Sequence, residues 1–402
     1  MANVSSSNGL EKRPKLRFPG FDEPYKQCRI GDIYAERSQR GASDMELLSV
    51  TMNDGVMPRS EIESKDNSSE DKSNYKVVLT GDMVYNSMRM WQGANGISPC
   101  DGIVSPAYTV LMPKVPISNG YFAAFFKSPN LINEFRRNSQ GMTSDTWNLK
   151  YPQIETIKVC IPALSEQKRV SDMLGTLERR IAKQAQLVDN LKKYKRGVMQ
   201  RIFRQLPTQN GAEWACVRLG DIFKKVSRRN TDGVIKNVIT NSAEYGLIPQ
   251  RDFFDKDIAV DGNTANYYVI ENGDFVYNPR KSNSAPYGPF NRYTLSEQGI
   301  ISPLYTCLVL QADISPSYLA WYFKSDAWYR YIYDNGSQGV RHDRVSMTDD
   351  LLMGIPVMYP SHVKQLLYAD ILDMVEARLQ ATQKTLDLLS KTRDGYMRQL
   401  FI

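Results

Sequence analysis

The sequence predicts an α+β protein in which two pseudo-repeated mixed α/β domains are joined to two long helices that form an antiparallel coiled coil. Two observations support this prediction. The second half of the chain repeats short motifs of the first half in the same order. Each half also ends in a long proline-free stretch whose apolar residues recur at steps of four and three. At 402 residues the chain exceeds one ordinary core, because domains usually hold about 100–200 residues.

The repeat is clearest around one turn. Residues 74–86 (NYKVVLTGDMVYN) and 266–278 (NYYVIENGDFVYN) are identical at eight of thirteen positions, where ordinary composition gives about one identity. Four further motifs match: RIGDI at 29–33 with RLGDI at 218–222, GIVSP at 102–106 with GIISP at 299–303, YFAAFFKS at 121–128 with YLAWYFKS at 318–325, and SQG at 139–141 with 337–339. The offset grows by insertions between matched blocks, which is typical of a duplicated domain that diverged through its loops.

Within each copy, short apolar runs broken by Gly, Asp, Asn and Pro indicate strands. In the first copy these runs are 75–79, 83–86 and 108–111, and an amphipathic helix is expected at 121–126. The Gly-Asp pair at 81–82 returns at 273–274, and we interpret it as a turn before a strand rather than a DNA contact, since Gly permits unusual dihedrals and Asp bonds local backbone.

The long helices are expected at 166–203 and near the C-terminus. Ser165 is the expected N-cap of the first, with Glu166 in its first turn. In the second copy Val363-Lys364-Gln365 stands where the first copy has Ser-Glu-Gln, so the acidic residue is missing and the capping of the second helix is left open. Polar residues interrupt both seams at matching positions, Gln184 with Thr382 and Lys195 with Arg393. The predicted helix–helix seam consists of Val170, Leu174, Leu177, Ile181, Val188, Leu191, Leu372, Val375, Leu379, Leu386 and Leu389.

Composition places the chain among globular proteins. Its formal charge of +7, from 51 Lys and Arg against 44 Asp and Glu, permits a polyanionic partner without demanding one. The five cysteines form no CxxC pair, and neither an N-terminal apolar leader nor a run of about 18 apolar residues is present. A reducing cytoplasm is therefore the expected location.

The sequence offers little catalytic chemistry. Only two histidines are present, and no GxxxxGK[ST] phosphate loop occurs. Asn278-Pro279-Arg280 is similar to the Asn-Pro-Pro-aromatic motif of adenine methyltransferases, but its duplicate is Asn86-Ser87-Met88 and no Gly-rich cofactor loop follows a strand. We predict no catalytic residue, no metal ligand and no cofactor in this chain.

Over residues 16–402 the motifs resemble the specificity subunit of type I restriction-modification systems. The resemblance is carried by LRFPGF at 16–21, the two Gly-Asp-Ile motifs, GDMVYN at 81–86 with its copy, GIVS at 102–105, IP at 161–162 followed by SEQ at 165–167, and GVMQRIF at 197–203. It implies a flexible tail at 1–15, target recognition domains at 16–164 and 212–361, and helical spacers at 165–204 and 362–402.

The resemblance also implies a function and partners. Each recognition domain reads one half of a bipartite target in double-stranded DNA, and the helices hold the halves at a fixed spacing. Two modification subunits carry S-adenosylmethionine and methylate adenine, and restriction subunits use ATP and Mg²⁺. Such a chain is bacterial or archaeal, cytoplasmic and not itself an enzyme. The alternative is a coiled-coil scaffold that reads no DNA.

Polar residues in loops that differ between the copies are the expected DNA contacts, because base identity is read through hydrogen-bond patterns. For each of them a solvated surface position is an equally good interpretation. The candidates are Arg89, Gln92, Arg136, Arg137, Gln140 and Ser144 in the first copy, and Arg280, Lys281, Asn283, Gln338, Arg341 and Arg344 in the second. Trp91, Trp147 and Trp321 could stack on bases, although core packing is the favoured role.

Overall fold

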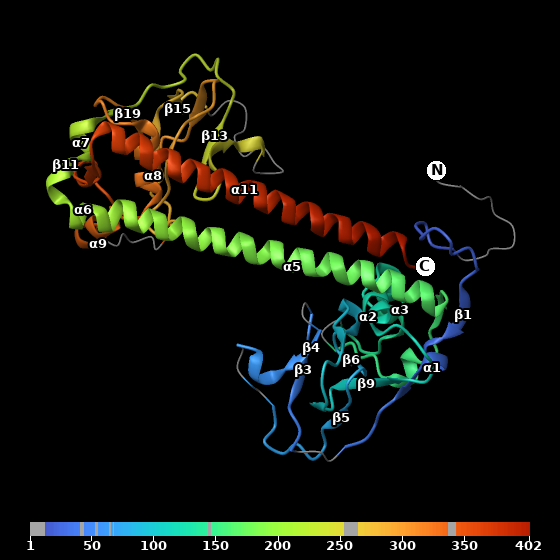
Figure 1. Cartoon of the computed structure of the whole chain (residues 1–402). Coiled ribbons are helices and arrows are strands. Elements are labelled where there is room, and N and C mark those ends of the chain that lie inside the picture. The colour runs from blue at the N-terminus through green and yellow to red at the C-terminus, as the bar shows by residue number, and fades with distance from the viewer. Residues whose placement is uncertain are drawn as a thin grey trace. The chain divides into compact units, whose positions relative to one another are not determined.

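The computed structural model describes residues 13–40, 44–52, 55–63, 66, 68–143, 146–252, 264–336 and 343–402. The chain forms two compact units. Unit 1 contains residues 1–186 together with 383–402, and unit 2 contains residues 187–382. Two long helices, α5 (Leu164–Gln200) and α11 (His362–Gln399), each contribute one part to each unit (Figure 1). None of the helices in these described ranges is long and apolar enough to cross a membrane.

The globular part of unit 1 mixes short helices with antiparallel strands. Its four-stranded sheet has the order β2-β9-β6-β7, and the pairs β1-β10, β3-β4 and β5-β8 form separate ribbons. The strands are β1 (Lys26–Arg29), β2 (Tyr34–Glu36), β3 (Leu48–Thr51), β4 (Gly55–Pro58), β5 (Lys76–Val78), β6 (Met83–Asn86), β7 (Asn95–Ile97), β8 (Gly102–Val104), β9 (Tyr108–Pro113) and β10 (Lys158–Ile161). The helices are α1 (Ile30–Ile33), α2 (Asn119–Phe125), α3 (Pro129–Asn138) and α4 (Tyr151–Ile154), with 3-10 turns η1 (Arg59–Glu61) and η2 (Met90–Gln92).

Unit 2 repeats this topology strand for strand. Its four-stranded sheet has the order β12-β19-β16-β17, and the ribbons are β11-β20, β13-β14 and β15-β18. The strands are β11 (Ala215–Arg218), β12 (Phe223–Val226), β13 (Ile239–Ser242), β14 (Gly246–Pro249), β15 (Tyr268–Ile270), β16 (Phe275–Tyr277), β17 (Phe290–Arg292), β18 (Gly299–Ile301), β19 (Thr306–Leu310) and β20 (Pro356–Tyr359). The helical elements are η3 (Arg201–Gln205), α6 (Leu206–Gln209), η4 (Gly211–Glu213), α7 (Leu219–Ile222), η5 (Gln250–Asp252), α8 (Pro316–Lys324), α9 (Tyr329–Asn335) and α10 (Asp349–Met353).

These elements confirm the predicted α+β class and the internal duplication. The strands expected at 75–79, 83–86 and 108–111 are present as β5, β6 and β9, and the helix expected at 121–126 is α2. Local chemistry explains where two helices start, α3 in unit 1 and α8 in unit 2, which are not equivalent elements of the two copies. Ser128 and Ser315 each accept a hydrogen bond from the backbone N–H three residues later, at 3.4 Å, and a proline follows each serine.

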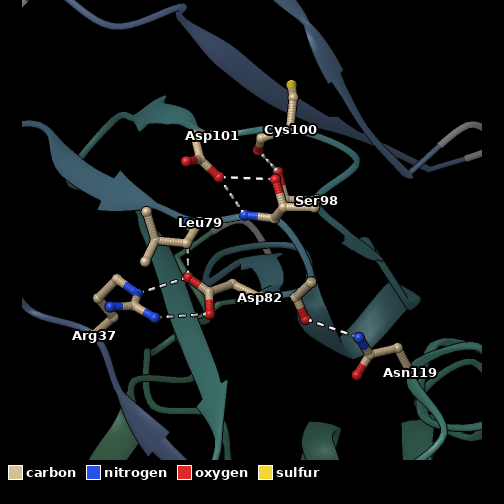
Figure 2. A network of polar contacts seen from close by, with 9 residues as sticks. Arg37, Leu79, Asp82, Ser98, Cys100, Asp101 and Asn119 are labelled. Carbon is tan, nitrogen blue, oxygen red and sulfur yellow. Dashed lines mark hydrogen bonds and ion pairs between the residues drawn. The ribbon is translucent and has the colours of Figure 1, made fainter.

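The Gly-Asp turn is structural in both units, as predicted. Gly81 has φ +90° and Gly273 has φ +99°, conformations that favour glycine. Figure 2 shows that the buried Asp82 accepts hydrogen bonds from the Leu79 N–H at 2.9 Å and from Arg37 Nε at 2.6 Å.

Unit 2 reproduces this turn. Asp274 accepts hydrogen bonds from the Glu271 N–H at 2.9 Å and from Arg228 Nη2 at 2.7 Å. Burial raises the pKa of Asp274, while the Glu271 N–H and Arg228 oppose that shift. An internal ion pair therefore closes the same turn twice.

The two long helices begin with the same glutamine contact. Gln167 Nε2 donates to the Pro162 carbonyl at 2.9 Å, and its Oε1 accepts the Ser118 N–H at 3.1 Å. Gln365 makes the matching bonds to Pro360 at 2.9 Å and to Ser315 at 2.8 Å. The second helix is therefore anchored although its acidic residue is absent, because the glutamine alone satisfies both backbone groups.

The predicted N-cap of the first helix is wrong. α5 begins at Leu164, one residue before Ser165, and the Ala163 carbonyl accepts the N–H groups of Glu166 and Gln167. Ser165 lies exposed inside the first turn. Glu166 is buried and accepts two hydrogen bonds from Arg17, at 2.9 and 2.8 Å, so a charged contact with a distant segment lies at this helix start where a serine cap was expected.

The end of each helix packs into the globular part of a unit. In unit 2 the Phe203 ring lies 5.5 Å from the Tyr318 ring and 5.7 Å from the Tyr322 ring. In unit 1 the Phe401 ring, 198 positions later, lies 5.4 Å from both Tyr121 and Phe125. Each unit therefore combines the start of one long helix with the end of the other, all within one aromatic core.

Within each unit the helices run antiparallel. In unit 1, Val170 near the start of α5 shares a core with Leu400, and Glu178 lies 3.9 Å from Arg393. In unit 2, Ile202 shares a core with Leu372, and Lys195 lies 2.9 Å from Glu376. The polar seam positions 195 and 393 thus hold equivalent ion pairs, as a duplicated register predicts.

The predicted seam residues are all at least partly shielded from solvent. Val170, Leu174, Leu177, Val188, Leu372 and Leu379 are buried, and Ile181, Leu191, Val375, Leu386 and Leu389 are partly buried. Thr382, the polar interruption of the second seam, is also buried and donates its hydroxyl to the Arg378 carbonyl at 2.7 Å. A hydroxyl that bonds its own helix can occupy an apolar seam without an unpaired donor.

Candidate nucleic-acid interface

Two loop segments of each globular domain are joined by backbone hydrogen bonds. In unit 1 the Leu149 N–H donates to the Ser87 carbonyl at 2.8 Å, and in unit 2 the Val345 N–H donates to the Pro279 carbonyl at 2.9 Å. These bonds are equivalent in the two copies. The loop after β6 or β16 and the segment before α4 or α10, which were predicted separately as DNA contacts, therefore form one continuous surface in each domain.

In unit 1 this surface is aromatic. The Trp91 and Trp147 rings meet edge to face at 5.2 Å, and the Arg136 guanidinium lies 5.6 Å from the Trp147 ring centre. Trp91 Nε1 donates to the Met88 carbonyl at 3.0 Å, and the Met88 side chain is 43% exposed. Both tryptophans are partly buried rather than internal. By contrast Trp321 is buried and donates to Asp373 at 2.8 Å, which is the core role favoured for it.

In unit 2 the surface is charged. Arg280 and Arg344 face each other across a two-stranded ladder closed by the Lys281 N–H to the Asp343 carbonyl at 2.9 Å and by the bond from Val345. Asp343 lies between them, with its Oδ2 3.9 Å from the Nε of each arginine. Burial raises the pKa of Tyr305 while both guanidiniums act to lower it, so this hydroxyl lies near the pair.

The remaining candidates lie around these surfaces. Arg89 and Gln92 are exposed at the two ends of η2, and Gln140 bonds Asn148 through its backbone in both directions, at 2.9 and 2.8 Å. Arg137 has other neighbours than the tryptophans. It pairs with Glu134 at 2.8 Å and lines a hollow that is also lined by Ile402. Asn283 lies exposed in the loop after β16. Ser144, Gln338 and Arg341 fall outside the described residues.

Asn278 has a structural role. Its Oδ1 accepts the Arg280 N–H at 3.0 Å, and its Nδ2 donates to the Asn241 carbonyl at 3.3 Å. Asn86 makes the same turn with the Met88 N–H at 3.0 Å. In a methyltransferase motif this asparagine would bind adenine, but here the polar atoms of Asn278 are already hydrogen-bonded to the backbone of Arg280 and Asn241.

Asp343, Met88 and Asn148 were not among the predicted contacts, although the structure places them on these surfaces. The sequence repeat already matches position 88 with 280, and the equivalent backbone bonds add the matches of 147 with 343 and of 148 with 344. No residue is identical between segments 88–92 and 280–284, or between 147–148 and 343–344. Across the described ranges, no group of three or more His, Cys, Asp or Glu side chains is arranged to hold a metal ion.

Comparison of the whole structure with solved structures gives matches over nearly the full chain. An S subunit of a type I restriction-modification system from M. genitalium is 14% identical, with 97% of this chain and 99% of that chain covered and a TM-score of 0.57. The HsdS subunit from Thermoanaerobacter tengcongensis is 15% identical, with 98% and 99% covered and a TM-score of 0.50. The chain has the fold of these S subunits.

A third structure, described as showing complex assembly and conformational transition of the type I R-M system, is 16% identical, with 96% of this chain and 99% of that chain covered and a TM-score of 0.55. No protein-family model and no curated protein matches the sequence. At such identities the likeness concerns the arrangement of elements, because most side chains on the loop surfaces differ.

Proposed function

We propose that this chain is the specificity subunit of a type I restriction-modification complex and is not itself an enzyme. Each globular domain reads one half of a bipartite target in double-stranded DNA. Modification subunits, which bring S-adenosylmethionine, methylate adenine in that target, and restriction subunits use ATP and Mg²⁺ to cut. We place this complex in the cytoplasm of a bacterium or archaeon.

One observation carries the proposal. The two domains share their strand pairing, the ion pair of the Gly-Asp turn and the glutamine contact at the long helix, yet their joined loop surfaces carry different side chains, Trp91 and Trp147 in one and Arg280 and Arg344 in the other. A duplicated scaffold that presents two unlike surfaces suits a target with two unlike halves. The full-length likeness to S subunits supports this interpretation. Arginines and partly buried tryptophans on matching loops favour DNA recognition over a scaffold that only joins proteins, because DNA is contacted mainly through such side chains.

The decisive experiment is to map methylated adenines across the host genome before and after deletion of this gene. We expect methylation to disappear from one bipartite motif and to return when the gene is restored on a plasmid. Loss and return at a single motif would support recognition, because this chain would then be required for methylation of one sequence and of no other. An unchanged pattern of methylation would favour the scaffold alternative.

A biochemical control separates recognition from catalysis. The purified chain alone, incubated with S-adenosylmethionine and its target duplex, is expected to transfer no methyl group, and the modification subunit is expected to restore transfer. Methyl transfer by the chain alone would contradict the assigned role.

A further inference from the structure

Arg280 and Arg344 use their charge differently from Arg228, the arginine of the Gly-Asp turn in unit 2. Arg228 is hydrogen-bonded to buried Asp274 at 2.7 Å. Arg280 and Arg344 approach Asp343 only at 3.9 Å, and within the described ranges neither guanidinium makes a hydrogen bond. Their side chains are 70% and 35% exposed. Among the described residues, both forks therefore keep N–H groups that no side chain accepts, beside a long ion pair to Asp343.

The backbone fixes where the two arginines point. The bonds from Lys281 to Asp343 and from Val345 to Pro279 flank the pair on both sides, so Arg280 and Arg344 occupy a non-hydrogen-bonded position of an antiparallel ladder. At such a position the Cα atoms are about 4.5 Å apart and the side chains stand on the same face. Like charges placed opposite each other in a ladder are destabilising. One carboxylate between two guanidiniums offsets only part of that repulsion.

This arrangement matches one kind of ligand. Guanine presents two acceptors, O6 and N7, at the edge of the major groove, and an arginine fork binds both. A phosphate can be bound by a flexible lysine as well as by an arginine fork, whereas the pair of acceptors on guanine matches the planar fork of an arginine, and here two such forks stand on one face of the ladder with a carboxylate 3.9 Å from each. The matched positions in unit 1 are Met88 and Asn148, with Trp147 in place of Asp343, and an apolar side chain of this kind contacts the thymine methyl group instead.

Resting on the proposed function, we propose that Arg280 and Arg344 are specificity-determining residues that read guanine in one half-site, with Asp343 as the residue that positions them. The half-site read by unit 2 contains at least one G·C pair that these arginines contact. The matched surface of unit 1, built on Met88, Trp147 and Asn148, reads its half-site without an arginine pair.

The test uses the full-length chain together with its modification subunit and a duplex library of random base pairs, from which bound duplexes are selected and sequenced. Wild type is expected to enrich a bipartite motif. The variant Arg280→Met/Arg344→Asn, which installs the residues of the first copy, is expected to lose roughly 10- to 100-fold of its preference for G·C at one or two positions of one half-site. The other half-site is expected to stay unchanged.

A second variant, Arg280→Lys/Arg344→Lys, keeps the charge and removes the fork, so it remains informative if the first variant folds poorly. It is expected to bind DNA at low salt while losing the G·C preference at the same positions. Lys224→Ala, which removes an exposed charge on β12, is the matched control and should keep the wild-type motif. Thermal melting of each variant reports whether the fold is retained.

The outcomes separate the two proposals. A lysine variant that keeps the full G·C preference would show that the arginine forks do not determine it, and a methionine–asparagine variant that binds all sequences more weakly by the same factor would identify phosphate contacts; either result overturns this inference alone. A wild-type motif without G·C in either half would overturn it as well. If wild type with its modification subunit enriched no bipartite motif, the proposed function itself would fail.

Discussion

The two globular domains of this chain agree in their interiors and differ on one surface. Arg37 with Asp82 and Arg228 with Asp274 close the same turn, and Gln167 and Gln365 anchor the two long helices through the same backbone groups. On the joined loops the agreement stops. The comparison teaches that contacts which hold the domain together tolerate little change after duplication, whereas surface side chains are free to diverge.

The first way to test this agreement is to remove the aromatic ring at the end of each long helix. Phe203→Ala and Phe401→Ala are each expected to lower the free energy of unfolding by about 3–5 kcal/mol, because both rings are buried among tyrosines or phenylalanines. Urea denaturation of both variants measures the losses. If Phe401→Ala left the free energy of unfolding unchanged while Phe203→Ala lowered it, the C-terminal residues would not be part of the unit 1 core.

The second test addresses the one helix start where the copies differ in charge. Glu166 is 1% exposed and is bound by Arg17, whereas the matched Lys364 pairs with Glu213 at a surface where both side chains are more than 40% exposed. Removing one partner of a buried pair leaves an unpaired charge, so Glu166→Ala is expected to cost about 3 kcal/mol. Lys364→Ala is expected to cost far less, because water screens an exposed ion pair. Calorimetric melting compares them, and equal costs would contradict the difference in burial.

The smallest effect on stability is expected at the ion pairs of the polar seam positions, Lys195 with Glu376 and Arg393 with Glu178. Burial opposes the charge of Glu376, but the hydrogen bond and charge of Lys195 outweigh it and hold the pKa of that carboxyl below its usual value. A carboxyl whose pKa is lowered on folding contributes stability above its unfolded pKa and loses it as pH falls through the folded value.

Unfolding curves from neutral pH down to about pH 3 should therefore show a shallower acid loss of stability in Glu376→Gln than in wild type. The matched variant Glu178→Gln in unit 1 should change the curve less, since its pair with Arg393 is longer, at 3.9 Å. A larger change in the curve for Glu178→Gln than for Glu376→Gln would show that the N–O distance of an ion pair does not determine how much it contributes to stability.

Much of the fold could be predicted from the order of residues alone. The motif copies predicted the duplication, and the step of four and three predicted the long helices and their seams, because periodicity records which face of a helix is apolar. The Gly-Asp turn was also predictable, since only glycine readily adopts the positive φ that Gly81 and Gly273 have.

The sequence pattern led to a wrong prediction at the start of α5. Serine before an acidic residue is a typical N-cap, yet α5 begins at Leu164, where the Ala163 carbonyl accepts the first N–H groups and Arg17 from another segment binds Glu166. Helix propensity and capping act over a few residues, and an ion pair between residues 149 positions apart lies beyond their reach.

What the sequence by itself determined is the pair of domains, the seams that join the helices within each unit, and the set of loops that differ between the copies. Only the tertiary structure decided that the two variable loops of each domain form a single surface, and that Asp343 lies between Arg280 and Arg344. The physical reason is that backbone bonds such as Val345 to Pro279 join segments distant in the chain, and neither periodicity nor composition encodes which partner a backbone N–H will find.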